Sequence, residues 1–211
     1  IGSQIGDMDG YSYMDYIVPG LILMAIITNS YSNVVSSFYS AKYQSHIQEM
    51  LVAPLPNYII LLGFVAGGVA RGVAVGIVVT IVSLFFSDLN IAHLGITLSI
   101  AILTATLFSI AGLINGIYAN SFDDISIIPT FVLTPLTYLG GIFYSISMLP
   151  QFWQNVSLAN PIIYMVNGFR YGILGDSDIT PYASFALIGI FIVALYLFAI
   201  YLLNKGHGIR N

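Results

Sequence analysis

Residues 57–86 read NYIILLGFVAGGVARGVAVGIVVTIVSLFF, and this run decides the fold class. Arg71 is its only charged residue. A helix needs about 20 predominantly apolar residues to cross the hydrocarbon core of a bilayer. The run exceeds that length, so it predicts a transmembrane helix and an integral membrane protein.

Four other stretches of the chain have the same character. They lie at residues 16–38, 94–118, 127–148 and 183–203. Each is long enough to span a bilayer as a helix, and none alternates apolar and polar residues with a period of two. The sequence therefore predicts an all-α polytopic membrane protein with five spans, forming a single transmembrane domain over residues 1–211.

The composition agrees with a chain that lies mostly in lipid. Of 211 residues, 58% are hydrophobic and 7% are charged, and the mean hydropathy is +0.92. Ordinary soluble domains are about 25% charged, so a cytosolic globular enzyme and a disordered chain are both excluded. Five Lys and Arg residues cannot neutralise a phosphate backbone, which excludes a nucleic-acid partner. The absence of Cys excludes disulfides and thiolate metal sites.

Lysine and arginine residues set the expected orientation. Lys42 follows the first span, and Lys205 and Arg210 follow the last. Arg170 alone lies on the opposite side. Positively charged loops stay in the cytoplasm, so we expect Lys42, the 120–126 loop and the C-terminal end inside. The N-terminal end then lies outside without a signal peptide, and we expect a further span to precede this sequence.

Residues 149–180 separate the fourth and fifth spans and differ from both. Their apolar stretches are too short to cross a bilayer and are typical of re-entrant or interfacial helices, whose irregular backbone lies within protein or along a cavity. For Arg170, pairing with an outer aspartate, anchoring to a lipid phosphate and facing an anionic substrate all stay open. The residues expected to shape this outer hairpin and loop are Pro150, Trp153, Asn160, Pro161 and Arg170.

Residues 44–56 form a loop after the first span. The part up to residue 52 is compatible with a helix in which Ile47, Met50 and Leu51 share one face. Glu49 lies on another face, and two prolines end the helix. We predict that these four side chains contact a partner protein on the cytoplasmic side. A helix that lies on the lipid headgroups stays open as the alternative.

Polar side chains also occur inside the predicted spans. Ser32 and Ser36, with Asn33 beside them, lie along one side of the first span. A lipid-facing Asn is costly, so this stripe faces protein or water. It is interpreted either as a hydrogen-bonded seam between helices or as the lining of a translocation pathway. Arg71 is either a snorkelling anchor or a buried ion-pair or pathway residue.

Two further patterns have structural interpretations. Gly68, Gly72 and Gly76 recur every four residues, which favours close packing of helices within the chain over a dimer seam. Asp123 and Asp124 stand where the fourth span begins, and carboxylates there complement the helix dipole. Neighbouring residues of a helix point apart, so metal or acid–base chemistry is disfavoured for this pair.

The sequence lacks the common catalytic and nucleotide-binding motifs. It contains no H-E-x-x-H, G-x-S-x-G or G-x-x-x-x-G-K-[ST] pattern, and its three His residues are far apart. We therefore expect no catalytic residue, no metal site and no cofactor bound by this chain.

Four stretches carry a resemblance to a known family. They read LVAPLPN (51–57), GFVAGGVARG (63–72), SFDDISIIPTFVLTPLTYLGGIFYS (121–145) and LPQFWQNVSLANPIIYMVNGFRYG (149–172). In this order they resemble the membrane subunit of ABC-2-type exporters, in the ATP-binding-cassette superfamily. The resemblance covers essentially the whole chain. Family members begin with an interfacial helix and a first span, and neither is present in this sequence.

The resemblance implies a transport function in the bacterial cytoplasmic (inner) membrane. Family members work as dimers of membrane subunits, here expected as a homodimer among membrane lipids, with two ATP-binding subunits that hold ATP and Mg²⁺. Residues 45–53 would be the coupling helix, and residues 149–172 the re-entrant hairpin. Family substrates include polysaccharides, lipids and drugs, and this sequence does not choose among them.

Two other classes of protein remain as alternatives. A secondary transporter or channel needs ionisable residues at mid-membrane, and Arg71 is the only deep candidate. An intramembrane enzyme needs paired catalytic residues within the spans, which are absent. The expected protein is therefore a permease subunit rather than an enzyme, with ATP hydrolysis in a separate subunit.

Overall fold

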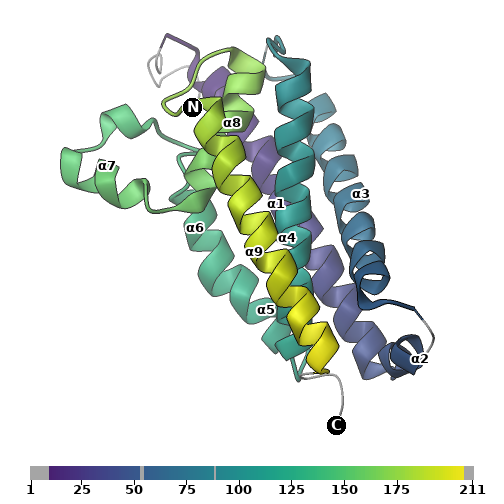
Figure 1. The fold of residues 1–211 in the computed structure, drawn as a ribbon. Coiled ribbons are helices and arrows are strands. Elements are labelled where there is room, and N and C mark those ends of the chain that lie inside the picture. The colour runs from purple at the N-terminus through teal and green to yellow at the C-terminus, as the bar shows by residue number, and fades with distance from the viewer. Residues whose placement is uncertain (1–9, 53–54, 88, 207–211) are drawn as a thin grey trace.

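The computed structural model describes residues 10–52, 55–87 and 89–206, and for residues 48, 51 and 52 it describes the helical backbone alone. All the elements assigned in these ranges are helical. Four helices are long and apolar enough to cross a membrane (Figure 1). They are α1 (Tyr13–Tyr43), α3 (Asn57–Ser83), α4 (Leu94–Tyr118) and α9 (Pro181–Lys205).

In the described part of the chain, seven shorter helical elements connect or flank these four. The α-helices are α2 (His46–Val52), α5 (Asp124–Ile128), α6 (Thr134–Tyr138), α7 (Gln151–Ser157) and α8 (Pro161–Leu174). A π-helical turn, η2 (Pro129–Leu133), joins α5 to α6, and a 3-10 turn, η3 (Ile146–Met148), precedes α7. The prediction of an all-α membrane protein is confirmed.

The predicted fourth span, residues 127–148, differs in the structure. Helix α5, η2 and α6 follow one another as a helical segment over residues 124–138, which we call the column. Prolines break its regular bonding: Pro129 accepts a π-type bond from the backbone N–H of Thr134, and Pro135 lacks an N–H. The segment ends in a glycine turn with Gly141 at φ +73°. It is shorter than the about 20 residues of a straight span, so the fifth span of spanning length is not confirmed.

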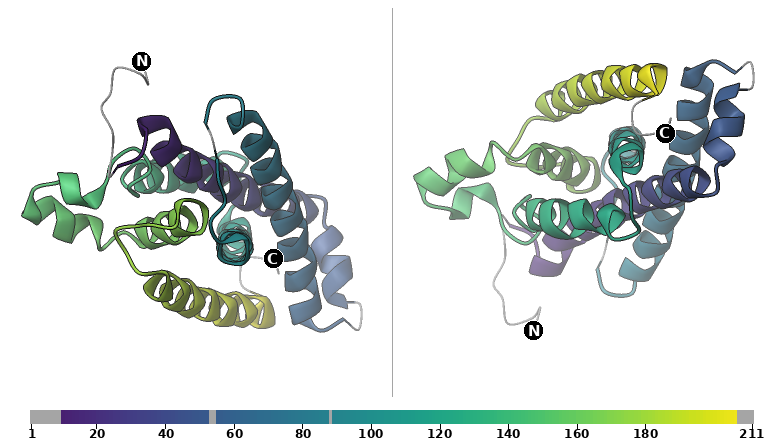
Figure 2. Two further views of the ribbon diagram at one scale, coloured as in Figure 1. Left: turned by 90° about the horizontal axis from the view of Figure 1, so that it is seen from above. Right: turned by 90° about the horizontal axis from the view of Figure 1, so that it is seen from below.

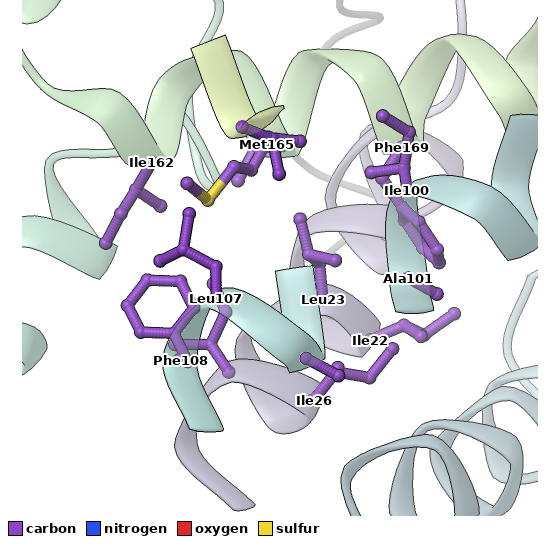
Figure 3. Packing of buried hydrophobic residues seen from close by; sticks show 14 of the residues in the cluster. Ile22, Leu23, Ile26, Ile100, Ala101, Leu107, Phe108, Ile162, Met165 and Phe169 are labelled. Carbon is purple, nitrogen blue, oxygen red and sulfur yellow. The ribbon is translucent and has the colours of Figure 1, made fainter. Parts of the chain in front are cut away.

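The core forms where α1 packs against α3, α4 and α8. Leu23 of α1, Leu107 and Phe108 of α4, and Met165 of α8 belong to one buried cluster, and Figure 3 shows Leu107 pointing toward Met165. Lipid tails are as apolar as these side chains, so close packing rather than water exclusion holds such helices together.

Glycines permit the closest helix contacts. A Cβ on Gly72 of α3 would lie 2.9 Å from the Cβ of Ser30, and one on Gly112 of α4 would lie 2.6 Å from the backbone oxygen of Tyr31. A Cβ would likewise meet Ser109 at Gly68 and Ile26 at Gly76. The prediction that Gly68, Gly72 and Gly76 serve packing within the chain is confirmed.

The two ends of the bundle have different contents (Figure 1). The end of α1, all of α2, the beginning of α5 and the end of α9 lie together at one end. That end carries Lys42 and Lys205, so we call it the inner end, the side that the positive-inside rule predicts to face the cytoplasm. Helix α7 projects sideways from the bundle in the outer half, as both views of Figure 2 show. Residues 88 and 210 lie outside the described ranges.

Candidate functional site

Helix α2 lies at the inner end and has one anchored face. Ile47 is 2% exposed and packs with Phe38 and Leu61 in a core cluster of its own chain. Ile47 therefore holds α2 in place, and its predicted contact with a partner is corrected: the helical pattern identified its face but not what that face meets. Glu49 and Met50 are exposed, while the side chain of Leu51 lies outside the described residues.

Two serines of the polar stripe of α1 face the column. Ser32 and Ser36 of α1 line a pocket of about 170 Å³ together with Ser126 of α5 and Thr130 of η2. We call this hollow and its open surroundings the groove. It brings hydroxyl groups of α1 and of the column together in one place.

Two polar side chains next to this stripe bond the backbone of their own helix. Asn29 donates to the backbone oxygen of Ala25 at 2.9 Å, and Ser37 donates to that of Asn33 at 2.7 Å. Ser36 is exposed, and Ser32 and Asn33 are partly exposed. These contacts therefore favour a surface that meets water or another protein over a hydrogen-bonded seam between helices of this chain.

Arg71 lies midway along α3 and is exposed. It stands one helical turn from Gly67, where an added Cβ would lie 3.8 Å from the side-chain oxygen of Asn33. Its exposure on this chain argues against the interpretation as a buried ion pair. The snorkelling and pathway interpretations both remain predictions.

Arg170 is the largest of the fully buried side chains, at 1% exposure. Its Nη2 donates to the backbone oxygen of Gly141 at 2.7 Å, and its Nε donates to that of Tyr16 at 3.4 Å. The guanidinium also lies over the ring of Tyr16, 3.9 Å from its centroid. Arg170 therefore joins α8 to α1 and to the turn after the column. It also lines an outer pocket of about 360 Å³ beside Asp176 and Asp178.

Asn160 holds the beginning of α8. Its side-chain oxygen accepts from the N–H of Ile162 at 3.0 Å, and its side-chain nitrogen donates to the backbone oxygen of Leu136 at 2.8 Å. Pro161 occupies the first turn, where its missing N–H is harmless. Helix α8 thus begins at these two residues, and its cap also binds the α6 part of the column.

The other two predicted residues of this region lie in the projecting part. Pro150 precedes α7, and Trp153 is 55% exposed with its ring edge-to-face against Phe152 at 5.3 Å. Both belong to the projection rather than to the buried surroundings of Arg170. A re-entrant position of residues 149–180 in the bilayer stays a prediction.

Lys42 has a role that the sequence did not reveal. Its Nζ donates to the backbone oxygens of Ile117 and Ala119 at 2.9 and 2.7 Å, at the end of α4. Asp124 lies nearby and accepts from the backbone N–H groups of Asn120 and Ser121. The N–H of Asn120 and the hydroxyl of Ser121 are the main causes that lower the pKa of Asp124. The predicted role of Asp124 at a helix start is confirmed.

Acidic and histidine side chains are scattered over the described ranges. No three His, Asp or Glu side chains gather there in a way that could hold a metal ion. What the described residues do provide is a groove within the span, an exposed helix face at the inner end and a buried arginine near the outer end.

Comparison with known proteins places this geometry in context. The model of a family described as "ABC-2 type transporter" matches residues 1–174. "Inner membrane transport permease YadH" of Escherichia coli (strain K12) is 56% identical over 211 residues, which cover 100% of this chain and 82% of that protein. "Nodulation protein J" of Rhizobium leguminosarum bv. viciae is 23% identical over 206 residues, which cover 97% of this chain and 80% of that protein.

Proposed function

The chain belongs to the ABC-2 type transporter family, and from this premise we propose that two copies form an exporter driven by a separate ATP-binding-cassette ATPase. As a transport permease with several membrane-spanning helices, the chain is a multi-pass protein of the bacterial inner membrane. It binds no cofactor of its own in this proposal, and ATP with Mg²⁺ resides on the ATPase.

The observation that carries the coupling part is the two-sided character of α2. Ile47 fixes the helix to the core, whereas Glu49 and Met50 point away from the chain at the inner end. An anchored helix with a charged and an apolar side chain exposed is suited to a partner's surface cleft. A helix that only rested on headgroups would need no acidic residue on its exposed side.

The groove supports the transport part. One wall is the polar stripe with Ser32 and Ser36, and the other is the column. The groove is open on this chain, so a second copy is proposed to complete a pathway between the two subunits. Arg71, exposed midway along α3, is retained as a pathway candidate.

Charge reversal on α2 tests the proposal. Glu49→Lys is expected to reduce co-purification of the ATPase at least about tenfold, because reversing a charge at a docked surface removes one contact and adds a repulsive one. Asp123→Lys is the matched control, since Asp123 is another exposed carboxylate at the inner end. Both variants should insert into the membrane normally.

Three outcomes separate the alternatives. Loss of the ATPase from Glu49→Lys alone supports docking through α2. Equal retention by both variants contradicts it and favours the headgroup position. Absence of any ATPase from the purified wild-type permease, with transport intact, would favour a secondary transporter or channel.

A further inference from the structure

The end of α1 is joined to the loop between α4 and α5 by a group of contacts that we call the inner clasp. Its first part is Lys42, whose ammonium group bonds the backbone oxygens of Ile117 and Ala119 at the end of α4. A cation at this position satisfies free carbonyls and interacts favourably with the helix dipole. These bonds link the last turn of α1 to the last turn of α4.

The second part of the inner clasp is aromatic. The ring of Phe122 lies 4.9 Å from that of Tyr39 and 5.6 Å from that of Tyr43, measured between centroids. The hydroxyl of Tyr39 donates to the backbone oxygen of Asn120 at 3.0 Å. The loop that follows α4 is therefore attached to α1 through backbone and side-chain contacts together.

The third part connects the loop to the column. The carboxylate of Asp124, at the start of α5, accepts the N–H groups of Asn120 and Ser121 at 2.9 and 3.1 Å. In return the N–H of Asp124 donates to the hydroxyl of Ser121 at 3.2 Å. A displacement of the loop thus displaces the first turn of α5.

Helix α2 is attached to the same end of α1. Only two residues separate the helices, and Ser45 adopts a left-handed conformation with φ 63° while its N–H bonds the backbone oxygen of Lys42. A non-glycine residue is rarely found in this conformation. Because the turn is so short, a displacement of α2 is expected to move the last turn of α1 and the inner clasp with it.

The column itself is weakly held along its length. Helix α5 has no buried residue, η2 has Leu133 and α6 has Thr137. It is held near its ends by the inner clasp and Asn115 on one side and by Asn160 on the other, and Leu133 packs in the core between them. Segments with few buried contacts rearrange at low free-energy cost.

We propose that the inner clasp transmits displacement of α2 to the column, with Lys42 as the positioning residue. The inference rests on the proposed function, in which a docked ATPase moves α2. It adds that the motion reaches the groove through the loop between α4 and α5, so that nucleotide state alters the separation of the column from α1.

Cross-linking across the groove tests this transmission. The chain has no Cys, so Ser36→Cys with Ser126→Cys introduces a single pair on the two walls of the groove. The measured quantity is the rate of oxidative disulfide formation in the purified permease–ATPase complex, with and without ATP and vanadate. In this background we expect vanadate trapping to change the rate at least threefold.

Two substitutions of lysine then isolate the inner clasp. Lys42→Met removes the donor. We expect it to reduce the vanadate-induced change in the rate of disulfide formation to less than 1.5-fold, while the ATPase remains bound and hydrolyses ATP. Lys42→Arg retains a donor and should restore most of the change. Lys205→Met, which removes the ammonium over the ring of Tyr201 at the end of α9, is the control and should behave as the parent.

The outcomes distinguish this inference from its premise. Transmission through the inner clasp is overturned if Lys42→Met keeps the full vanadate-induced change in cross-linking rate. It is also overturned if the double-cysteine protein with Lys42 intact shows no such change in a complex that hydrolyses ATP. Either result leaves the proposed function standing. Failure of the wild-type permease to bind any ATPase overturns the proposed function and this inference with it.

Discussion

Arg71 and Arg170 place the same charged group in two contrasting settings. Arg71 lies on a long helix with one face buried and is exposed midway along it. Arg170 lies on the short helix α8, and carbonyl oxygens of two other segments and an aromatic ring surround it. The contrast teaches that this fold buries an arginine where carbonyl oxygens of two other segments reach it, whereas the arginine midway along α3 stays at the surface of the chain.

Replacing Arg170 should show the largest effect on stability. Arg170→Ala removes the charge-assisted bonds from Nη2 to the oxygen of Gly141 and from Nε to that of Tyr16, together with the contact over the Tyr16 ring. We expect a loss of about 3 kcal/mol or more in the free energy of unfolding, measured by SDS titration with circular dichroism. Arg170→Lys keeps the charge but lacks the planar guanidinium group with its several donors, so it should recover only part of the lost stability. If Arg170→Ala were as stable as the wild type, the contrast between Arg170 and Arg71 would not hold.

Asn160 sharpens the comparison, because it binds the column with a neutral amide. Asn160→Ala loses the helix cap and the bond to the oxygen of Leu136. The expected cost is about 1–2 kcal/mol in the same titration, smaller than for Arg170 because the lost bonds join neutral groups. Asn155→Ala, at an exposed position of α7, is the matched control and should change stability by less than about 0.5 kcal/mol. Equal effects of the two alanine variants would argue that the cap is incidental.

Arg71 should give the smallest effect on stability. Arg71→Ala removes an exposed side chain, so the free energy of unfolding of the isolated subunit should change by less than about 0.5 kcal/mol. Reduced ATPase stimulation or transport in this variant, with normal stability, would support the pathway interpretation. A destabilisation comparable to that of Arg170→Ala would instead reveal a structural role within the subunit and remove the contrast between the two residues.

Long apolar runs made much of the fold predictable. The third predicted span, residues 94–118, coincides with α4, and the second begins with α3 at Asn57. Hydropathy records how apolar a stretch is but not how its backbone bonds, so the prolines and glycines within residues 127–148 were hidden in an apolar run. The resulting column is the element that the sequence described least well.

The site was predictable in residue type more than in role. Arg170 and Asn160 were identified because charged and polar residues stand out near apolar segments. Their partners were not, because backbone oxygens of Gly141 and Leu136 carry no signal in the sequence. For the same reason Lys42 was interpreted only as a marker of orientation. Ile47 was placed on the correct helix, but periodicity does not say which face meets the core.

The column also has a mechanical consequence. A segment that is attached at both ends and buries few residues between them deflects most near its middle. The middle of the column is η2, where the hydroxyl of Thr134 reaches the oxygen of Pro129 at 2.9 Å and the bonding is of π type. The bending stiffness of this one turn, more than the strength of either attachment, would then set how widely the groove opens for a given displacement at the inner end.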